Sequence, residues 1–570
     1  MRYYRNNHLL FTLCILLFFI SCNGHKETTI KEKEIVADPR TIDEYIQSNL
    51  EDILHVASEN NGKINDTFRI YFYGVLNNFY NSKNYKPSWS RMAKWDPLSD
   101  SLLGYIKNAS QDGLFPGDYH FTELNELKEI LNRDSVKRMD AVLWAKVDLL
   151  HTDAFMHILQ DLKQGRLQPD SLAWKNDTAM QRIFFLERMN ELIVNREFSK
   201  LIDSVQPVHT GYLNLKKSIK NFIDSMDTKT YTYIHYPYKK NDEKDSLMFI
   251  QTLQERLVES GIVNKVSPVP DSTALSALIK QYQKGNNITA DGKITAALIN
   301  KLNLSDAEKY KRIAITLDRY KQLPAAMPEK YIWVNLPAYS LTVWDADTLV
   351  FQSKVICGKP TTPTPVLTSA ISDLVIFPTW TVPESIITKE MLPGLKKNTG
   401  YLARKGLSLL NNKGEEVDPA TVNWAKYSKG IPYKIQQGSG DENALGVIKF
   451  NFSNPFAVYL HDTNQRYLFK NSARALSHGC VRVQDWKNLA FYIIRNDSIH
   501  KIPPDTLRYT TDSITSWIAQ KERHRINVAY KFPLFIRYFG CEVVNGSIKF
   551  YDDIYGLDKL MRDKYFAVKN

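Results

Sequence analysis

Cysteine is scarce in this chain: five occur among 570 residues, at Cys14, Cys22, Cys357, Cys480 and Cys541. No two of them form a CxxC pair, and the first two fall within the first 22 residues. The other three are widely spaced and odd in number, which argues against a disulfide framework and against a zinc cluster. At least one thiol is therefore left without a disulfide partner.

A long hydrophobic run is also missing. The apolar stretch "LLFTLCILLFFI" (9–20) has twelve residues, fewer than the ~20 that a helix needs to cross a bilayer. Two arginines precede it in "MRYYRNN" and small residues follow it in "SCNG", an order typical of an export signal. We therefore expect residues 1–22 to be a signal peptide, residues 23–40 to be a polar linker, and the protein to be exported.

The end of this segment carries a further feature. The stretch "FFISC", which ends at Cys22, resembles the lipobox of bacterial lipoproteins, with Phe19 where that pattern usually has Leu. The resemblance implies cleavage before Cys22, lipidation of its thiol and attachment to a membrane. An uncleaved anchor and an ordinary cleaved signal are the alternatives.

Basic residues exceed acidic ones, with 74 Lys and Arg against 62 Asp and Glu. Such a balance suits an anionic partner. The basic residues are spread along the chain, however, and no nucleic-acid-binding motif accompanies them, so we expect no nucleic-acid partner. The length suggests roughly three to four domains.

The first half of the chain is predicted to be helical. Residues 138–167 keep apolar side chains at three- and four-residue spacing, and we expect a helical scaffold domain over 41–245. Its isolated histidines are interpreted as packed or surface residues, namely His120, His151, His157 and His209. Residues 246–304 predict a small module of three helices, with Asp271 or Ser272 as one N-cap, and 305–327 a connecting helix.

The pattern then changes to strands. Between 328 and 510, alternating segments rich in Val, Ile, Trp and Tyr predict a mainly β domain. Residues 384–432 are polar and have poor strand character, so we expect an insertion over the sheet. Residues 511–570 mix a helix with short strands and are expected to form a C-terminal extension. The fold class is thus α+β with several domains.

The sequence "SHGCVRV" (477–483) offers a candidate site. Cys480 follows Gly479 and precedes a predicted helix near 483, whose N-terminus would stabilise a thiolate. His461 ends the predicted strand "FAVYLH" and is a better candidate base than His478, whose side chain should diverge from that of Cys480. A core cysteine and a metal ligand beside these histidines remain alternatives, although no acidic ligand has suitable spacing.

These motifs resemble a known family. "YLHDT" (459–463) followed by "LSHGCVRV" (476–483) is similar to the signature of the L,D-transpeptidases with a YkuD-type catalytic domain. The segments 358–393, 443–450, 79–90, 112–120 and 148–169 resemble its large periplasmic branch. Residues 246–304 resemble a peptidoglycan-binding domain, with Leu298 where that pattern usually has Thr, and Ser439 stands where the branch tends to have Pro.

The resemblance implies roles for these residues. Cys480 would be the nucleophile and His461 the general base, with the other ring nitrogen of His461 donating to a backbone carbonyl. The N–H groups of Gly479 and Cys480 would form an oxyanion hole. The other residues of the site would shape the loop and hold the substrate, namely Tyr459, Ser477, His478 and Arg482. The insertion 384–432 would correspond to the substrate lid.

The implied reaction cross-links peptidoglycan stems in the periplasm of a Gram-negative-type bacterium, with no metal and no cofactor. A tetrapeptide donor would acylate Cys480 and release D-Ala, and a diamino acid of a second stem would accept the acyl group. Carbapenems would acylate the same thiol. Two alternatives remain: an L,D-carboxypeptidase or cysteine peptidase, and a wall-binding scaffold without catalysis.

Overall fold

The computed structural model describes residues 30–66, 68–167, 182–265, 271–286, 288–499 and 509–566. The expected signal peptide, with Cys14 and Cys22, lies outside these residues. The chain forms two compact units, one of residues up to 101 with 122–155 and the other of residues 102–121 with 156–570. In the described part of the chain, we find no helix that combines the length and apolar character needed to span a membrane.

The first unit is helical, as the sequence predicts. It contains α1 (Ile42–Glu59), α2 (Tyr73–Ser82), the short pair β1 (Ser90–Arg91) and β2 (Lys94–Trp95), and parts of α3 (Pro97–Lys107), α4 (Phe121–Arg133) and α5 (Ala141–Lys163). His151 lies buried on α5 and its Nδ1 is 2.9 Å from the Val147 carbonyl. Burial lowers the pKa of His151 to about 4, which fits the predicted packed histidine.

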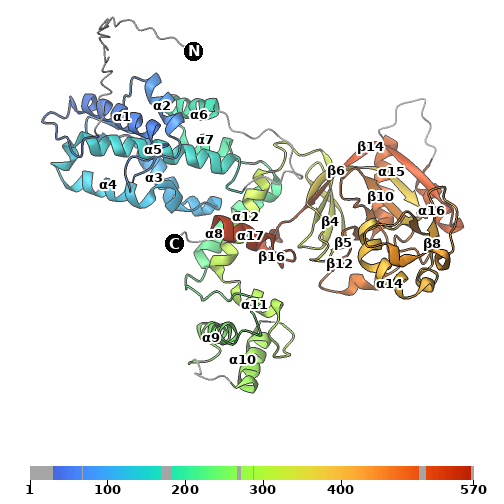
Figure 1. The fold of residues 1–570 in the computed structure, drawn as a ribbon. Coiled ribbons are helices and arrows are strands. Elements are labelled where there is room, and N and C mark those ends of the chain that lie inside the picture. The colour runs from blue at the N-terminus through green and yellow to red at the C-terminus, as the bar shows by residue number, and fades with distance from the viewer. Residues whose placement is uncertain are drawn as a thin grey trace, which may run out of the picture. The chain divides into compact units, whose positions relative to one another are not determined.

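The second unit begins with more helices (Figure 1), namely α6 (Arg182–Asn195), α7 (Phe198–Ser204) and α8 (Thr210–Ser225). The predicted three-helix module follows as α9 (Glu243–Glu259), α10 (Ser272–Gly285) and α11 (Ala296–Asn303), around a core that includes Leu253, Ile279 and Leu298. Asp271 is the N-cap of α10, because its side chain accepts the Thr273 N–H. The connecting helix is α12 (Asp306–Lys321).

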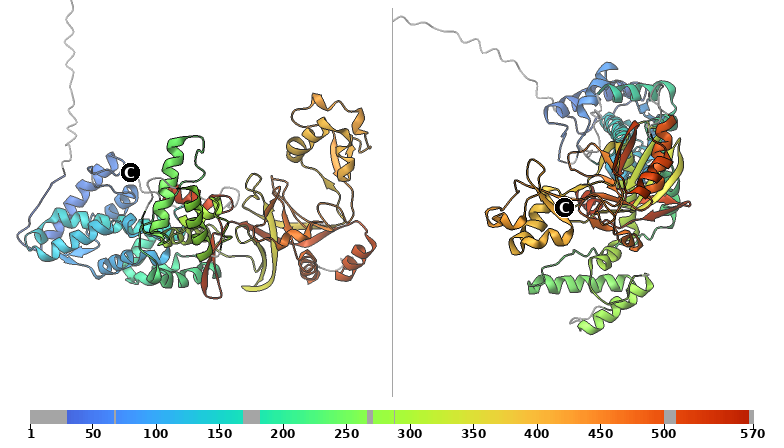
Figure 2. Two further views of the ribbon diagram at one scale, coloured as in Figure 1. Left: turned by 90° about the horizontal axis from the view of Figure 1, so that it is seen from below. Right: turned by 90° about the vertical axis from the view of Figure 1, so that its right-hand side faces the viewer.

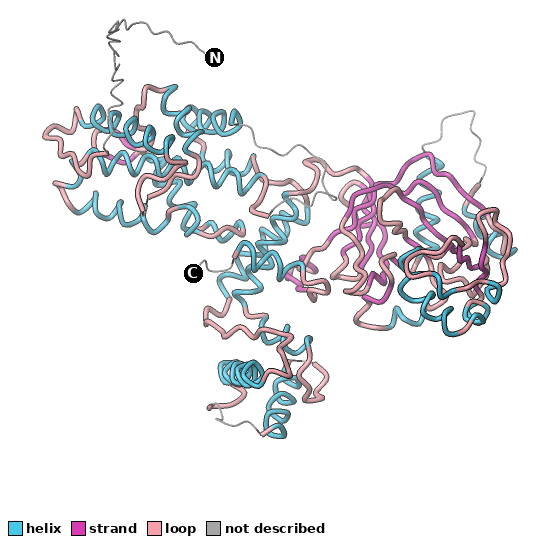
Figure 3. Tube along the Cα trace, in the orientation of Figure 1, coloured by secondary structure: helices cyan, strands magenta, loops and turns pink. Residues whose placement is uncertain are grey.

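A nine-stranded sheet dominates the rest of this unit (Figure 3). Its order is β12-β5-β13-β11-β10-β6-β14-β3-β4, and β4 also pairs with β5, so eight of the strands close into a ring. Closure leaves few unpaired strand edges. The strands are β3 (Lys330–Asn335), β4 (Ser340–Asp345), β5 (Thr348–Gly358), β6 (Leu367–Ile376), β10 (Ile448–Phe452), β11 (Leu460–His461), β12 (Ala475–Ser477), β13 (Val481–Val483) and β14 (His524–Arg537).

The C-terminal segment is part of this sheet. Strand β14 lies between β6 and β3, antiparallel to the first and parallel to the second. Two helices bury apolar side chains against the sheet, α15 (Trp486–Ile499) and α16 (Thr511–Gln520). The segment ends with the hairpin β15 (Cys541–Val544) and β16 (Ser547–Phe550) and with α17 (Leu557–Tyr565). Residues 511–570 therefore complete the sheet that residues 328–510 begin.

The predicted insertion, residues 384–432, forms most of a small subdomain with a core of its own, drawn in gold in Figure 2. The subdomain contains α13 (Glu384–Ile386), a π-helical turn (Ile387–Met391), α14 (Leu392–Lys397) and a sheet of β7 (Trp380–Thr381), β9 (Lys434–Gln437) and β8 (Leu407–Leu410), of which β7 and β9 flank the insertion. Its core includes Leu395, Leu402, Trp424 and Ile435. We call residues 384–432 the lid.

Candidate active site

Strands β11 and β13 bring the predicted site residues together. They run parallel, with Leu460 opposite Val481 and His461 opposite Arg482. Leu460 and Val481 are buried in the core, and because side chains alternate along a strand, Tyr459, His461, Cys480 and Arg482 extend from the other face. The ring centroids of Tyr459 and His461 are 5.7 Å apart. The spacing of the two sequence motifs thus corresponds to two neighbouring strands of one sheet.

Cys480 is half-buried immediately before β13. Its Sγ lies 3.9 Å from the Ala457 carbonyl oxygen. Burial raises the pKa of the thiol, while hydrogen bonding by Tyr459 and the charges of Lys449 and Arg482 act in the opposite direction. At rest Cys480 is therefore mainly a neutral thiol.

The helix expected to begin near 483 is present, but it starts three residues later, so its N-terminus does not directly follow Cys480. A short strand follows the cysteine, and α15 begins only at Trp486. Val481 and Val483 are buried in the core of the sheet, so the chain runs as a strand of the sheet before the helix starts. The charges of Lys449 and Arg482 favour the thiolate.

His461 is buried, with 4% of its surface exposed. Burial, reinforced by the charges of Arg482 and Lys449, lowers its pKa to about 3, although the backbone of Asp462 and Leu445 acts in the opposite direction. In the described part of the chain, Nδ1 of His461 has no partner within hydrogen-bond geometry. The backbone hydrogen bonding with Asp462 and Leu445, which raises the pKa of the ring, is consistent with the expected donation to a backbone carbonyl. The neutral imidazole can accept a proton.

The described contacts include no hydrogen bond between the Cys480 thiol and His461. Catalytic hydrogen bonds are often long without substrate and tighten when substrate binds. The sheet places the two residues on one face of adjacent strands.

Hydrogen bonds within residues 477–480 fix the conformation of the loop that carries Cys480. Ser477 Oγ donates to the Cys480 carbonyl oxygen at 2.5 Å, and the Gly479 N–H donates to Ser477 Oγ at 3.1 Å. Gly479 has φ +122°, a conformation that favours glycine. The Gly479 N–H, expected as an oxyanion donor, is thus engaged in this conformation, and the Cys480 N–H is the remaining candidate.

His478 and Arg482 point to different partners. His478 Nε2 lies 2.6 Å from Glu390 Oε1 in the lid, so this side chain diverges from the thiol as the sequence predicts. Arg482 Nη1 donates to Gln465 Oε1 at 3.0 Å. His478 therefore links the cysteine loop to the lid, and Arg482 stays beside His461.

Two residues that the sequence analysis missed support the cysteine loop from behind. Thr364 Oγ1 donates to the Gly479 carbonyl at 2.7 Å and accepts the Gly358 N–H at 2.9 Å. Tyr555 donates its hydroxyl to the Gly358 carbonyl at 2.8 Å. Tyr555 comes from the C-terminal segment, and no local pattern relates it to Gly479.

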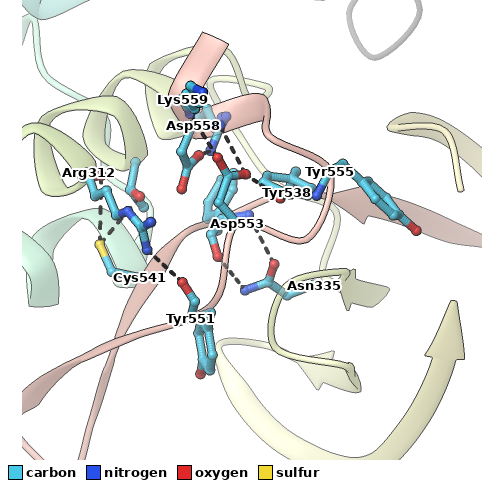
Figure 4. A network of polar contacts seen from close by, with 12 residues as sticks. Arg312, Asn335, Tyr538, Cys541, Tyr551, Asp553, Tyr555, Asp558 and Lys559 are labelled. Carbon is cyan, nitrogen blue, oxygen red and sulfur yellow. Dashed lines mark hydrogen bonds and ion pairs between the residues drawn. The ribbon is translucent and has the colours of Figure 1, made fainter. Parts of the chain in front are cut away.

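Tyr555 belongs to a larger polar network (Figure 4). Its backbone N–H donates to the Tyr538 hydroxyl at 3.0 Å, and that hydroxyl donates to Asp553 at 2.5 Å. Asp553 also accepts the backbone N–H groups of Asp558 and Lys559. The start of α17 is therefore connected by hydrogen bonds to the loop that carries Cys480.

A cavity of about 250 Å³ lies beside the thiol. Ala457 and Tyr459, the two residues nearest to Cys480 Sγ in the contacts above, form part of its wall. The other lining residues come from the base of the lid and from the sheet, namely Thr379, Trp380, Thr381, Val382, Pro383, Leu445 and Lys449. We call this cavity the thiol pocket.

The other two cysteines of the described chain are free and buried. Burial raises the pKa of Cys357 to about 11 and that of Cys541 to about 12. Across the described ranges, no group of three or more His, Cys, Asp or Glu side chains has an arrangement that could hold a metal ion. The structure thus distinguishes Cys480 as the one partly accessible thiol among the described cysteines.

Comparisons with known proteins agree with this geometry. Residues 74–219 match the model of a Scaffold domain, and residues 329–500 match that of the L,D-transpeptidase catalytic domain. A curated relative from Haemophilus influenzae, named "Putative L,D-transpeptidase", is 33% identical over 248 residues, which are 44% of this chain and 48% of the relative. The chain thus aligns with about half the length of that relative.

Solved structures give only a weak match. An L,D-transpeptidase from Mycobacterium smegmatis has 12% identity and a TM-score of 0.18, over 37% of this chain and 58% of its own. One from Enterococcus faecium has 11% identity and a TM-score of 0.17, over 46% and 82%. Scores this low carry no argument, and the family-model match is the informative finding. Residues 329–500 therefore belong to the L,D-transpeptidase catalytic domain family, in a chain that also carries a Scaffold domain.

Proposed function

We propose that this protein is a peptidoglycan L,D-transpeptidase that works through a thioester on Cys480. The donor is a tetrapeptide stem, whose third residue is joined to a terminal D-Ala. The acceptor is the side-chain amine of a diamino acid in a second stem. The product is a cross-link between two third residues, and no metal or cofactor takes part.

The first half of the reaction forms the acyl-enzyme. His461 takes the thiol proton as Sγ of Cys480 attacks the carbonyl carbon of the third residue. The negative charge on the carbonyl oxygen is stabilised by the Cys480 N–H. The C–N bond to D-Ala then breaks, and the proton on His461 passes to the leaving amine.

The second half transfers the acyl group. The acceptor amine attacks the thioester carbon and loses a proton to His461. The C–S bond breaks and the thiolate recovers that proton, which restores both groups. Because His461 is neutral at rest, it can act as the base in each half without a prior change of charge.

One observation carries this proposal: the half-buried thiol of Cys480 and the neutral imidazole of His461 lie on one face of adjacent strands, and their neighbours Ala457 and Tyr459 line an open cavity. A structural cysteine would have neither the base nor the space. The position of Cys480 within a matched L,D-transpeptidase catalytic domain adds support.

The cellular setting belongs to the same proposal. We infer export to the periplasm through residues 1–22 and a lipid anchor on Cys22, because of the residue pattern around "FFISC". The three-helix module α9–α11 is proposed to hold the enzyme on peptidoglycan. No nucleic-acid partner is proposed.

Muropeptide analysis tests the function. The full chain is incubated with peptidoglycan rich in tetrapeptide stems, and the products are digested and identified by mass, beside Cys480→Ala. We expect released D-Ala and dimers linked through third residues, both absent with Cys480→Ala. Tripeptides and D-Ala without dimers would instead identify a carboxypeptidase. Binding to peptidoglycan without any product would identify a wall-binding scaffold.

A further inference from the structure

Lys449 has a setting that the reaction above does not explain. It lies on β10, directly opposite His461 on β11. Its Nζ is 3.9 Å from the centroid of the Tyr459 ring, and none of the ion pairs between described residues involves it. A lysine with its charge partly removed from water usually has a carboxylate partner. The charge of Asp373 acts on Lys449, but Asp373 accepts hydrogen bonds from Asn451 and Arg525 instead. Lys449 can therefore bind an anion from outside the chain.

The thiol pocket is the place from which such an anion would come. Lys449 is the one charged residue among those that line it; the others are aromatic, apolar or hydroxyl side chains. The wall beside Lys449 is Tyr459, which also contacts the thiol. The charge of Lys449 also acts on the Cys480 thiol, so an anion held by Lys449 lies in the same part of the site as the thiol.

The alternation of β10 explains why this position is charged. Ile448, Phe450 and Phe452 are buried in the core, whereas Lys449 and Asn451 lie between them on the opposite face. The contact of Lys449 that depends on its charge is the one with the Tyr459 ring.

We propose that Lys449 binds a carboxylate of the stem peptide in the thiol pocket, which makes it a specificity-determining residue. The inference rests on the proposed function, because it names the group of the donor that this pocket recognises. An ammonium bound to a carboxylate forms a charge-assisted hydrogen bond, which fixes the donor with its carbonyl near Cys480.

The same contact assists proton transfer. His461 lies between Lys449 and Arg482, and both positive charges oppose a positive charge on its ring. A substrate carboxylate on Lys449 would offset one of them. The imidazole would thus become a better proton acceptor once a donor with a free carboxylate is bound.

Two carboxylates of the donor have the required chemistry. One is the terminal carboxylate of D-Ala, and the other is the free carboxylate of the diamino acid at the third position. Three substrates separate them: the parent tetrapeptide stem, its C-terminal carboxamide, and the stem with the third-residue carboxylate amidated. Each is assayed with the full chain by release of the fourth residue.

The variants are Lys449→Gln, Lys449→Arg and the matched control Lys487→Gln. Lys487 also lies over an aromatic ring, that of Phe491 at 5.4 Å, but it is on α15 and outside the pocket. With the parent stem we expect Lys449→Gln to lower kcat/KM by roughly tenfold to a hundredfold. We expect Lys449→Arg to retain most of the activity and Lys487→Gln to match the wild type.

The amidated stems give the decisive comparison. With one amidated stem, the kcat/KM of the wild type should fall to the value that Lys449→Gln has with the parent stem. With that same amidated stem, Lys449→Gln should be as active as the wild type. The role of Lys449 would be overturned if Lys449→Gln lost activity by the same factor on all three stems, or lost none on any of them, while the wild type still released the fourth residue. A wild type that releases nothing from any stem would overturn the proposed function itself. The amidated stems test the inference on the wild type alone, even if a variant fails to fold.

Discussion

Cys480 and His461 are both neutral in the resting site. Burial raises the pKa of the thiol and lowers that of the imidazole to about 3. Both shifts oppose a resting thiolate–imidazolium pair, in which each side chain would carry a charge away from water. In the proposed reaction the proton therefore moves during attack on the substrate, and the thiol stays protonated between turnovers.

Alkylation of Cys480 should consequently need alkaline solution. The raised thiol pKa predicts that the rate with iodoacetamide keeps rising through and beyond the range of an ordinary cysteine, ~8.5. Lys449→Gln should move the profile further upward, because the Lys449 charge favours the thiolate. The measurement is the rate against pH by mass spectrometry, with Cys480→Ala to subtract the other cysteines. A plateau already reached near neutral pH would contradict a neutral pair.

Cys480 and His461 were selected from the sequence as candidates, with Tyr459, Ser477, His478 and Arg482 around them, whereas Lys449 and Tyr555 were not. The alternation in "YLH" and the motif "SHGC" are local, so Cys480 and His461 could be selected without a structure. Lys449 had one available signal, a charge inside the apolar strand "GVIKFNF". Tyr555 had none, because its contact with Gly358 spans 197 residues of chain.

At the scale of elements, the cysteine loop depends on segments far away in the chain. The hydrogen bonds from Tyr555 to Gly358 and from Thr364 to Gly479 fix the backbone beside Cys480. Tyr555→Phe should lower the acylation rate several-fold and cost about 1 kcal/mol of stability for the lost hydrogen bond. The matched control is Tyr551→Phe, whose hydroxyl donates to Glu542 and not to this loop. Equal rates for the two variants would show that the support from Tyr555 is unimportant.

The lid makes one charged contact with the cysteine loop, between Glu390 and His478. Since both side chains are partly exposed, with 50% and 34% of their surfaces accessible, the pair should add little to stability. We expect Glu390→Gln to increase hydrogen exchange in residues 384–397 and to leave the melting temperature unchanged. Glu416→Gln, an exposed carboxylate in the same lid, is the control. Unchanged hydrogen exchange in Glu390→Gln would show that the contact between Glu390 and His478 does not hold the lid.

The elements themselves were partly predictable. Helices with regular apolar spacing, such as α5, and the capped helix α10 were visible in the sequence. The helix expected near 483 begins at Trp486, because the strand β13 (Val481–Val483) precedes it and a three-residue strand has too short a pattern to recognise. The lid was identified by its polarity, but its hydrophobic core depends on residues spread from Val382 to Ile435.

For the whole molecule, the C-terminal segment is the least expected part. It was predicted as an extension, yet β14 lies in the interior of the sheet and pairs with β6 and β3. Order of strands in a sheet is set by long-range pairing, which a single sequence does not reveal. The ring of strands could not close without it.

Removal of residues 511–570 should therefore unfold the catalytic domain. The truncated protein loses β14, and with it the backbone hydrogen bonds to two neighbouring strands and the buried side chains Phe532, Leu534 and Ile536. We expect an insoluble or molten product, detected by circular dichroism and hydrogen exchange. Removal of only the residues from 557 onwards spares β14 and serves as the control. A folded, active protein lacking 511–570 would contradict the assigned sheet.

The most direct test of the account is the mass of the intact full chain after incubation with a carbapenem, compared with Cys480→Ala. The account predicts one stable adduct on the wild type and none on Cys480→Ala, because Cys357 and Cys541 are buried thiols with raised pKa values. An adduct that persists in Cys480→Ala, or a folded wild type that gains no mass, would contradict the claim that Cys480 is the acylated nucleophile.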